Sequence, residues 1–281
     1  MLVVLLLVTL HINMGRISLS KKLDTEVNWR SDMGNGYWFE GELAMFHVVC
    51  ISTLVVMMIG FSAGRVAAQS SSIPNPYQSI LDWAQLPQGR TWGQMAALDI
   101  DSHGNIWAVE RCGGTTCNGR SEAPVLAFGP LGNLVKGLGA GVFVFPHGIA
   151  IDEDDSLWVT DGRAMDGKGH QVIKFSADGE IVMRLGTAGV AGEGPNTLNG
   201  PSAVAIAVNG DIFVGDGHGE GTNARVVKFS KDGVFIKAWG QRGVGPGEFS
   251  TPHSLAFDSR GRLFVGDREN NRIQIFTQEG M

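Results

Sequence analysis

Short apolar runs alternate with glycine-rich and Asp/Asn-rich turns along the chain downstream of residue 90. The runs IWAV, LWVT, IFVG and LFVG consist mainly of β-branched, aromatic and other apolar residues, and turn residues bound them, as is typical of strands. Glycine accounts for 40 of the 281 residues, about twice its usual share of roughly 7%. No Gly-X-Y period and no long helical period interrupts the pattern. The pattern therefore predicts an all-β chain with many tight turns.

The strand pattern recurs in four units. They begin at Met95, Pro146, Pro201 and Pro252, and the last three are spaced by 55 and 51 residues. Each unit holds an apolar strand, a polar turn, a strand ending in V-x-D or V-x-R, and a third strand such as QVIKFS, and the second and third units add a fourth strand, in GEIVMRLG and GVFIKAWG. Four strands per unit at a period near 50 residues predict the blades of a β-propeller. The fourth unit ends before its last strand, so we expect a partial propeller that belongs to a longer protein or to an assembly.

Residues shared by all units are expected to serve the fold. One acidic residue ends the second strand of each unit: Glu110, Asp161, Asp216 and Asp267. We expect these carboxylates to accept hydrogen bonds from nearby backbone N–H groups. Arg225 and Arg272 occupy a further shared position, where the second unit has Gln171, and we interpret them as structural too.

Histidine breaks the repeat in a regular way. His147 and His253 follow the first proline of the second and fourth units, whereas the third unit has Ser202 there. The turn itself therefore does not require histidine. Equivalent side chains from alternate blades of a closed propeller can converge on its axis, and three histidines that converge in this way suit a zinc ion. The third ligand is then expected from a blade outside this chain; the alternative is a polar residue that caps the start of a strand.

Arginine breaks the repeat in the same manner. Arg111 and Arg268 follow the strand-ending acid of the first and fourth units, where the other two units have glycine. An arginine fork beside a metal cavity suits a substrate carboxylate, which it binds with two parallel hydrogen bonds. The alternative is an ion pair with the neighbouring acid.

Two longer stretches carry a family resemblance. TPHSLAFDSRGRLFVGDRENNRIQIF and DGHGEGTNARVVKFSKDGVFIKAWG resemble NHL repeats and, more narrowly, the peptidyl-α-hydroxyglycine α-amidating lyases, which are six-bladed propellers. The resemblance covers about residues 91–281. It implies that His147 and His253 bind zinc, and that Arg268, with Arg111, holds a carboxylate-bearing peptide substrate. It also implies cleavage of the C–N bond to give a peptide amide and glyoxylate.

His218 is a departure from that family. The resembled lyases carry a tyrosine in the corresponding loop, where it acts near the zinc as a base. An imidazole can also take a proton near neutral pH, so we assign His218 a catalytic role, with an exposed loop histidine as the alternative.

A non-catalytic binding module is the alternative function. NHL propellers often present a ring of loops to a ligand, so a protein partner on the propeller face is expected in that case. The net charge of −6 and the lack of a Lys/Arg cluster argue against a nucleic-acid partner.

The N-terminal region predicts export. An apolar run over residues 48–61 is followed by Val66 and Ala68, which fit the small-residue rule for a signal-peptidase site. We interpret residues 45–68 as a signal peptide, 1–44 as an upstream extension, 69–90 as a linker and 91–281 as the partial propeller. The protein is then secreted or periplasmic, and it contacts a membrane only through an uncleaved N-terminal segment. The alternative is a membrane-anchoring or buried strand segment.

Two cysteines fit the same compartment. Cys112 and Cys117 enclose two glycines in the stretch CGGTTC. Such a loop can close as a disulfide where conditions are oxidising. A two-cysteine metal site is the alternative, although further ligands are missing from this stretch.

Export can be tested by N-terminal sequencing of the secreted protein. If residues 45–68 are a signal peptide, the mature chain should start at or near Gln69. Recovery of a mature protein that retains residues 45–68 would contradict the prediction.

Overall fold

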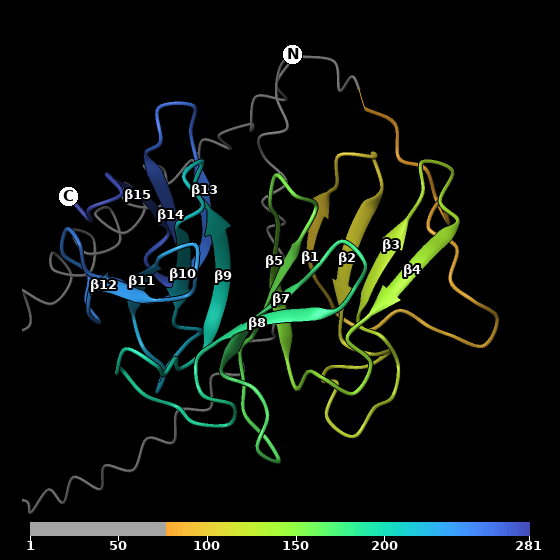
Figure 1. Ribbon diagram of the computed structural model, residues 1–281, viewed down its shortest axis with the longest axis horizontal. Coiled ribbons are helices and arrows are strands. Elements are labelled where there is room, and N and C mark those ends of the chain that lie inside the picture. Colours follow the sequence, from red (N-terminus) through yellow and green to blue (C-terminus); the bar gives the residue numbers. More distant parts are fainter. Residues whose placement is uncertain (1–76) are drawn as a thin grey trace, which may run out of the picture. The chain divides into compact units, whose positions relative to one another are not determined.

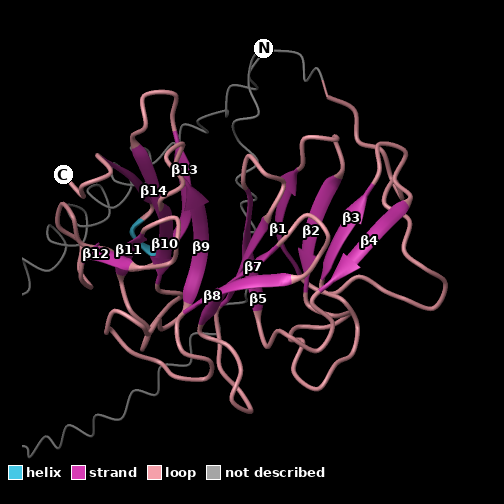
Figure 2. Ribbon diagram, viewed as in Figure 1, coloured by secondary structure: helices cyan, strands magenta, loops and turns pink. Residues whose placement is uncertain are grey.

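The structure, a computed structural model, describes residues 77–281. The predicted signal peptide and the upstream extension lie outside these residues. Within them the chain is built almost entirely of strands, and Figure 2 shows the one short 3-10 helix, η1 (Arg268–Asn270). No helix of this part is long and apolar enough to cross a membrane.

Each sequence unit folds into one antiparallel sheet whose strands follow chain order. The first sheet holds β1 (Met95–Ile100), β2 (Ile106–Glu110), β3 (Val125–Phe128) and β4 (Leu134–Leu138). The second holds β5 (Pro146–Ile151), β6 (Leu157–Asp161), β7 (Gln171–Phe175) and β8 (Ile181–Leu185). The third holds β9 (Pro201–Ile206), β10 (Ile212–Asp216), β11 (Arg225–Phe229) and β12 (Phe235–Trp239). The fourth holds β13 (Pro252–Phe257), β14 (Leu263–Asp267) and β15 (Arg272–Phe276).

The first strands of neighbouring sheets lie side by side. β5 contacts both β1 and β9, and β9 also contacts β13, so the sheets are arranged around a common inner side (Figure 1). This is the blade arrangement of a β-propeller. The predicted all-β propeller fold, with four units, is confirmed.

The core lies between successive blades. In β10, Ile212 and Val214 pack in the cluster shared with the second blade, whereas Phe213 packs with Leu263 and Val265 of the fourth. A strand that is buried on both faces needs apolar residues at consecutive positions, which explains the continuous runs in the sequence.

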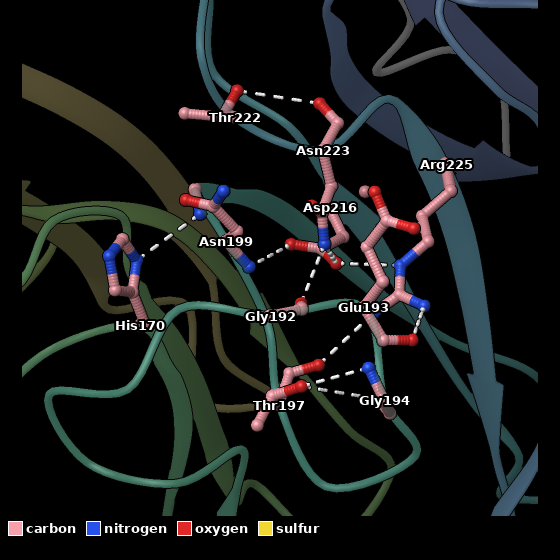
Figure 3. Close-up of polar contacts among 12 residues, drawn as sticks. His170, Gly192, Glu193, Gly194, Thr197, Asn199, Asp216, Thr222, Asn223 and Arg225 are labelled. Carbon is pink, nitrogen blue, oxygen red and sulfur yellow. Dashed lines mark hydrogen bonds and ion pairs between the residues drawn. The ribbon is translucent and has the colours of Figure 1, made fainter.

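A buried carboxylate ties the end of each second strand to the segment that enters the blade. Asp216, fully buried, accepts the N–H of Asn199 at 2.7 Å and the Nε–H of Arg225 at 2.9 Å. The same Arg225 donates to the carbonyl groups of Glu193 and Thr197 in the preceding loop, so one acid and one arginine hold the whole loop (Figure 3).

The other three blades repeat this contact. The backbone N–H donors are Val144 and Phe145 to Asp161, Ser250 and Thr251 to Asp267, and Gly93 and Gly113 to Glu110. The expected structural role of the strand-ending acids is therefore confirmed. We name these four acids the blade carboxylates.

The cysteines form the disulfide. Cys112 and Cys117 are bonded, with their Cα atoms 5.1 Å apart. Both are buried in the core between the first two blades, beside Val109 and Phe143. The pair is therefore a structural cross-link, and the two-cysteine metal site is wrong.

Loss of a blade carboxylate should be costly. Asp216→Ala should lower the free energy of unfolding by about 3–5 kcal/mol, because it leaves the buried Arg225 without its partner. Urea unfolding measures this change. Asp232→Ala, at an exposed turn of the same blade, should stay within about 0.5 kcal/mol of wild type. Equal effects of the two substitutions would contradict the role given to Asp216.

Candidate metal centre

Three histidines from two strands and one loop meet at the inner side of the blades. His147 is the second residue of β5, His253 is the second residue of β13, and His218 lies in the loop after β10. One ring nitrogen from each lies within 4.8 Å of those of the other two. The ring centroid of His147 is 4.4 Å from that of His218 and 4.7 Å from that of His253. Side chains from alternate blades therefore converge.

The third imidazole comes from this chain. From the sequence we expected the third metal ligand in a blade outside this chain, and we assigned His218 the role of a base. In the structure His218 is the third imidazole of the cluster. Glycine is needed at the bend that begins this loop, because a Cβ on Gly217, whose φ is +156°, would clash with the carbonyl oxygen of Asn223. Comparison of equivalent repeat positions could not reveal His218, because this loop has no counterpart of equal length in the other units.

A neighbouring strand orients the ring of His147. The Nδ1 of His147 lies 2.8 Å from the carbonyl oxygen of Ser202, and a carbonyl only accepts, so Nδ1 carries the proton. Nε2 is then left with a free lone pair, the form that binds metals. Ser202 is itself fixed, because its hydroxyl donates to the carbonyl of Pro252 at 2.6 Å. The serine at the odd position of the repeat thus links the two strands that carry His147 and His253.

Burial keeps the three rings neutral. Burial, followed by the positive charges of Arg268 and Arg111, lowers the pKa of His218 to about 4 and that of His253 to about 3. Burial also holds the pKa of His147 well below its usual range, with added repulsion from the other two histidines. At neutral pH the cluster therefore presents unprotonated nitrogens, as metal binding requires.

Two arginines lie against one aromatic wall of this cluster. The ring of Phe145 is 6.1 Å from that of His147 and 5.8 Å from that of His218. The guanidinium carbon of Arg111 lies 3.5 Å from the Phe145 ring centroid, and that of Arg163 lies 4.0 Å from it. Phe145 and Arg163 had escaped the sequence comparison. Two features of the sequence could have indicated them. Phe145 is an aromatic residue directly before the Pro-His pair, and Arg163 is an arginine in the loop after the V-x-D of the second unit.

The arginines differ in their partners. Arg111 is buried and donates to the side-chain oxygen of Gln94, while its Nε has no partner. Burial, and then the charge of Arg163, lower the pKa of Arg111 to about 10, so it stays charged at neutral pH. Arg268 is half-exposed and donates twice to the carboxylate of Glu269, at 2.9 and 2.8 Å. Arg268 thus forms an ion pair, as the alternative interpretation of the sequence expected, but its partner is the following residue, Glu269, instead of the strand-ending Asp267.

Two hollows in residues 77–281 are lined by residues outside this cluster. One of about 200 Å³ is lined by Asp101, His103 and Lys136. The Asp101 carboxylate there already accepts from Asn105 and Trp107, and His103 belongs to an exposed turn. The histidine cluster is therefore the stronger candidate for chemistry.

Known proteins resemble this chain in sequence. The model of the NHL repeat matches residues 249–276. The NHL repeat-containing protein 3 of Homo sapiens is 40% identical over 140 residues, which are 48% of this chain and 40% of that protein. Peptidyl-alpha-hydroxyglycine alpha-amidating lyase 1 of Drosophila melanogaster is 34% identical over 212 residues, 66% of this chain and 38% of that protein. The probable lyase of the same type, pgal-1, of Caenorhabditis elegans is 40% identical over 149 residues, 51% and 40%.

The chain is an NHL-repeat β-propeller protein, related to these amidating lyases. This NHL-repeat propeller spans about two fifths of the length of each of the three relatives.

The lowered histidine pKa values predict a pH dependence of stability in metal-free protein. His253, whose folded-state pKa is about 3, binds fewer protons when folded than when unfolded, where its pKa is about 6.5. The stability that the neutral ring contributes is therefore complete above pH 6.5 and is lost as the pH falls toward the folded value. His253→Gln removes this contribution.

Urea unfolding with a chelator present, at pH 7 and pH 4.5, measures the difference. Wild type should lose more stability than the variant between the two pH values. Parallel losses would contradict the assignment.

Proposed function

We propose that this chain carries a zinc-dependent site that cleaves a peptidyl-α-hydroxyglycine into a peptide amide and glyoxylate. The observation that carries the proposal is the meeting of three neutral imidazoles within 4.8 Å, beside a buried arginine without an acidic partner. The relationship to the Drosophila and Caenorhabditis proteins supports the reaction, because their names state it.

The donor set fits zinc. Catalytic zinc sites typically have three protein ligands, imidazole nitrogens among them, and keep the fourth position open. His147, His218 and His253 would hold the ion. When bound, zinc supplies a Lewis acid that eases loss of the proton from a hydroxyl group.

Arg111 would hold the substrate carboxylate. Its guanidinium is buried and lacks a carboxylate partner within residues 77–281, so an incoming carboxylate would gain strong charge-assisted hydrogen bonds there. Arg268 would add a second contact from the half-exposed side of the site. In the reaction the α-hydroxyl loses its proton, its oxygen becomes the carbonyl of glyoxylate, the C–N bond breaks, and the amide nitrogen takes up a proton. Atoms balance without a further reactant.

His218 has two possible parts in this reaction. As a metal ligand it would use the lone pair of one ring nitrogen, whereas as a base it would need a nitrogen that is free to take the hydroxyl proton. The short distances to His147 and His253 support the ligand. The tyrosine of the resembled lyases at this place supports the base.

The non-catalytic binding propeller remains the second candidate. It is supported by the relationship to NHL repeat-containing protein 3 of Homo sapiens, whose name states the repeats and no reaction. In either case the buried Cys112–Cys117 disulfide supports an oxidising compartment, secreted or periplasmic.

Metal analysis of the purified full-length protein tests the site. Wild type should bind about one zinc, and His147→Ala and His253→Ala should each lose most of it, because two remaining ligands hold zinc poorly. His103→Ala, at an exposed turn, is the matched control and should keep the metal. Arg268→Ala should also keep the metal and weaken binding of a carboxylate substrate.

His218→Tyr separates the two parts of His218. If His218 is a ligand, this variant should lose zinc; if it is a base, the variant should keep zinc and release glyoxylate from an α-hydroxyglycine peptide. Absence of zinc from the wild-type protein would contradict the metal site and favour the binding propeller. Zinc without glyoxylate release would leave the site and refute the reaction.

A further inference from the structure

The arginine side chains around the histidine cluster carry more positive charge than is paired with carboxylates among the described residues. Three guanidinium groups act electrostatically on His218: those of Arg111, Arg163 and Arg268. Of these only Arg268 has an ion-pair partner among the described residues, Glu269. Because the imidazoles are neutral, Arg111 and Arg163 remain two uncompensated charges at the same aromatic ring.

One ring holds these two arginines near each other at different depths. The guanidinium carbons of Arg111 and Arg163 lie 3.5 and 4.0 Å from the Phe145 ring centroid. The separation of the two carbons therefore cannot exceed the sum of these two distances. Arg111 is buried, whereas Arg163 is exposed. Stacking on an aromatic face fixes a guanidinium in place and leaves its edge donors free. The pair thus offers an inner and an outer contact for negative groups.

The loop that carries Arg163 does not neutralise it. Asp166 lies three residues further on but forms no ion pair with it, in contrast to the acid-paired Arg268. Lys168 of the same loop donates to the carbonyl of Gly141, which anchors the loop on the neighbouring segment. The guanidinium group of Arg163 is therefore held against Phe145 but forms no ion pair within the described residues.

We propose that Arg163 selects ligands that carry a second acidic group next to their terminal carboxylate, namely peptides with Asp or Glu directly before the C-terminal residue. The inference rests on the proposed function, in which the buried Arg111 takes the terminal carboxylate. Consecutive Cα atoms are about 3.8 Å apart, so the side chain of the preceding residue reaches the outer arginine while the terminus occupies the inner one.

Binding of two matched dipeptides tests the inference. N-acetyl-Asp-Gly and N-acetyl-Asn-Gly have nearly the same shape and differ by one negative charge. Calorimetry with the full-length protein, with a chelator present, should show about 1.4- to 5-fold tighter binding of the Asp probe, the range for a partly exposed ion pair. The preference should shrink in high salt.

Variants of one residue identify the source of the preference. Arg163→Gln should bring the two affinities to near equality, and Arg163→Glu should reverse their order. Arg260→Gln is the matched control, because it removes the same charge from the exposed β13–β14 turn, at the opposite end of β13 from His253. It should keep the wild-type preference.

Three results would overturn the inference: equal or absent binding of the probes by wild type, an unchanged preference in Arg163→Gln, or an equal loss of both probes in that variant. The zinc and glyoxylate tests are independent of this experiment. A charge preference without zinc or glyoxylate would refute the proposed reaction and leave the selectivity of Arg163 standing.

Discussion

The buried hydrogen bonds of the blade carboxylates fix both the fold and the place where the candidate site forms. Asp161 accepts the backbone N–H groups of Val144 and Phe145, and His147 follows two residues after Phe145. Asp267 accepts those of Ser250 and Thr251, two residues before His253. The backbone positions of His147 and His253 are therefore held by buried hydrogen bonds of defined geometry, two residues before each histidine. The same contact that orders the blades brings the ligand positions of alternate blades toward each other.

The electrostatics of the inner side follow from that geometry. Three imidazoles whose ring nitrogens lie within 4.8 Å of one another cannot all be charged imidazolium groups, because like charges in a desolvated place repel strongly. Their neutral state in turn lets the charged Arg111 lie close by. A region of neutral nitrogen ligands beside unpaired guanidinium groups suits a cation and an anion together. A metal ion with a carboxylate ligand meets both demands, which is why the proposed reaction and the proposed selectivity arise from one site.

Most of the fold was predictable, because a blade strand is buried on both faces and its sequence must show it. The repeat also located His147 and His253 by contrast with Ser202, since equivalent positions occupy equivalent places in the ring. Comparison of repeats could not predict His218, Phe145 or Arg163 as neighbours. His218 and Arg163 belong to loops of unequal length, and both side chains lie against the ring of Phe145 only because the blades that carry them pack side by side. The pairing of Cys112 with Cys117, by contrast, is a local property of a short glycine-rich loop, so the sequence indicated it.

The identity of the metal ligands is the central feature of the proposed site. X-ray absorption at the zinc edge, measured on zinc-loaded wild-type protein, reports the ligand atoms and their distances. If His147, His218 and His253 hold the ion, the spectrum should show three imidazole nitrogens at about 2.0–2.1 Å, with one further light-atom ligand at the open position. A shell of sulfur, or of oxygen with fewer than three imidazoles, would contradict this ligand set.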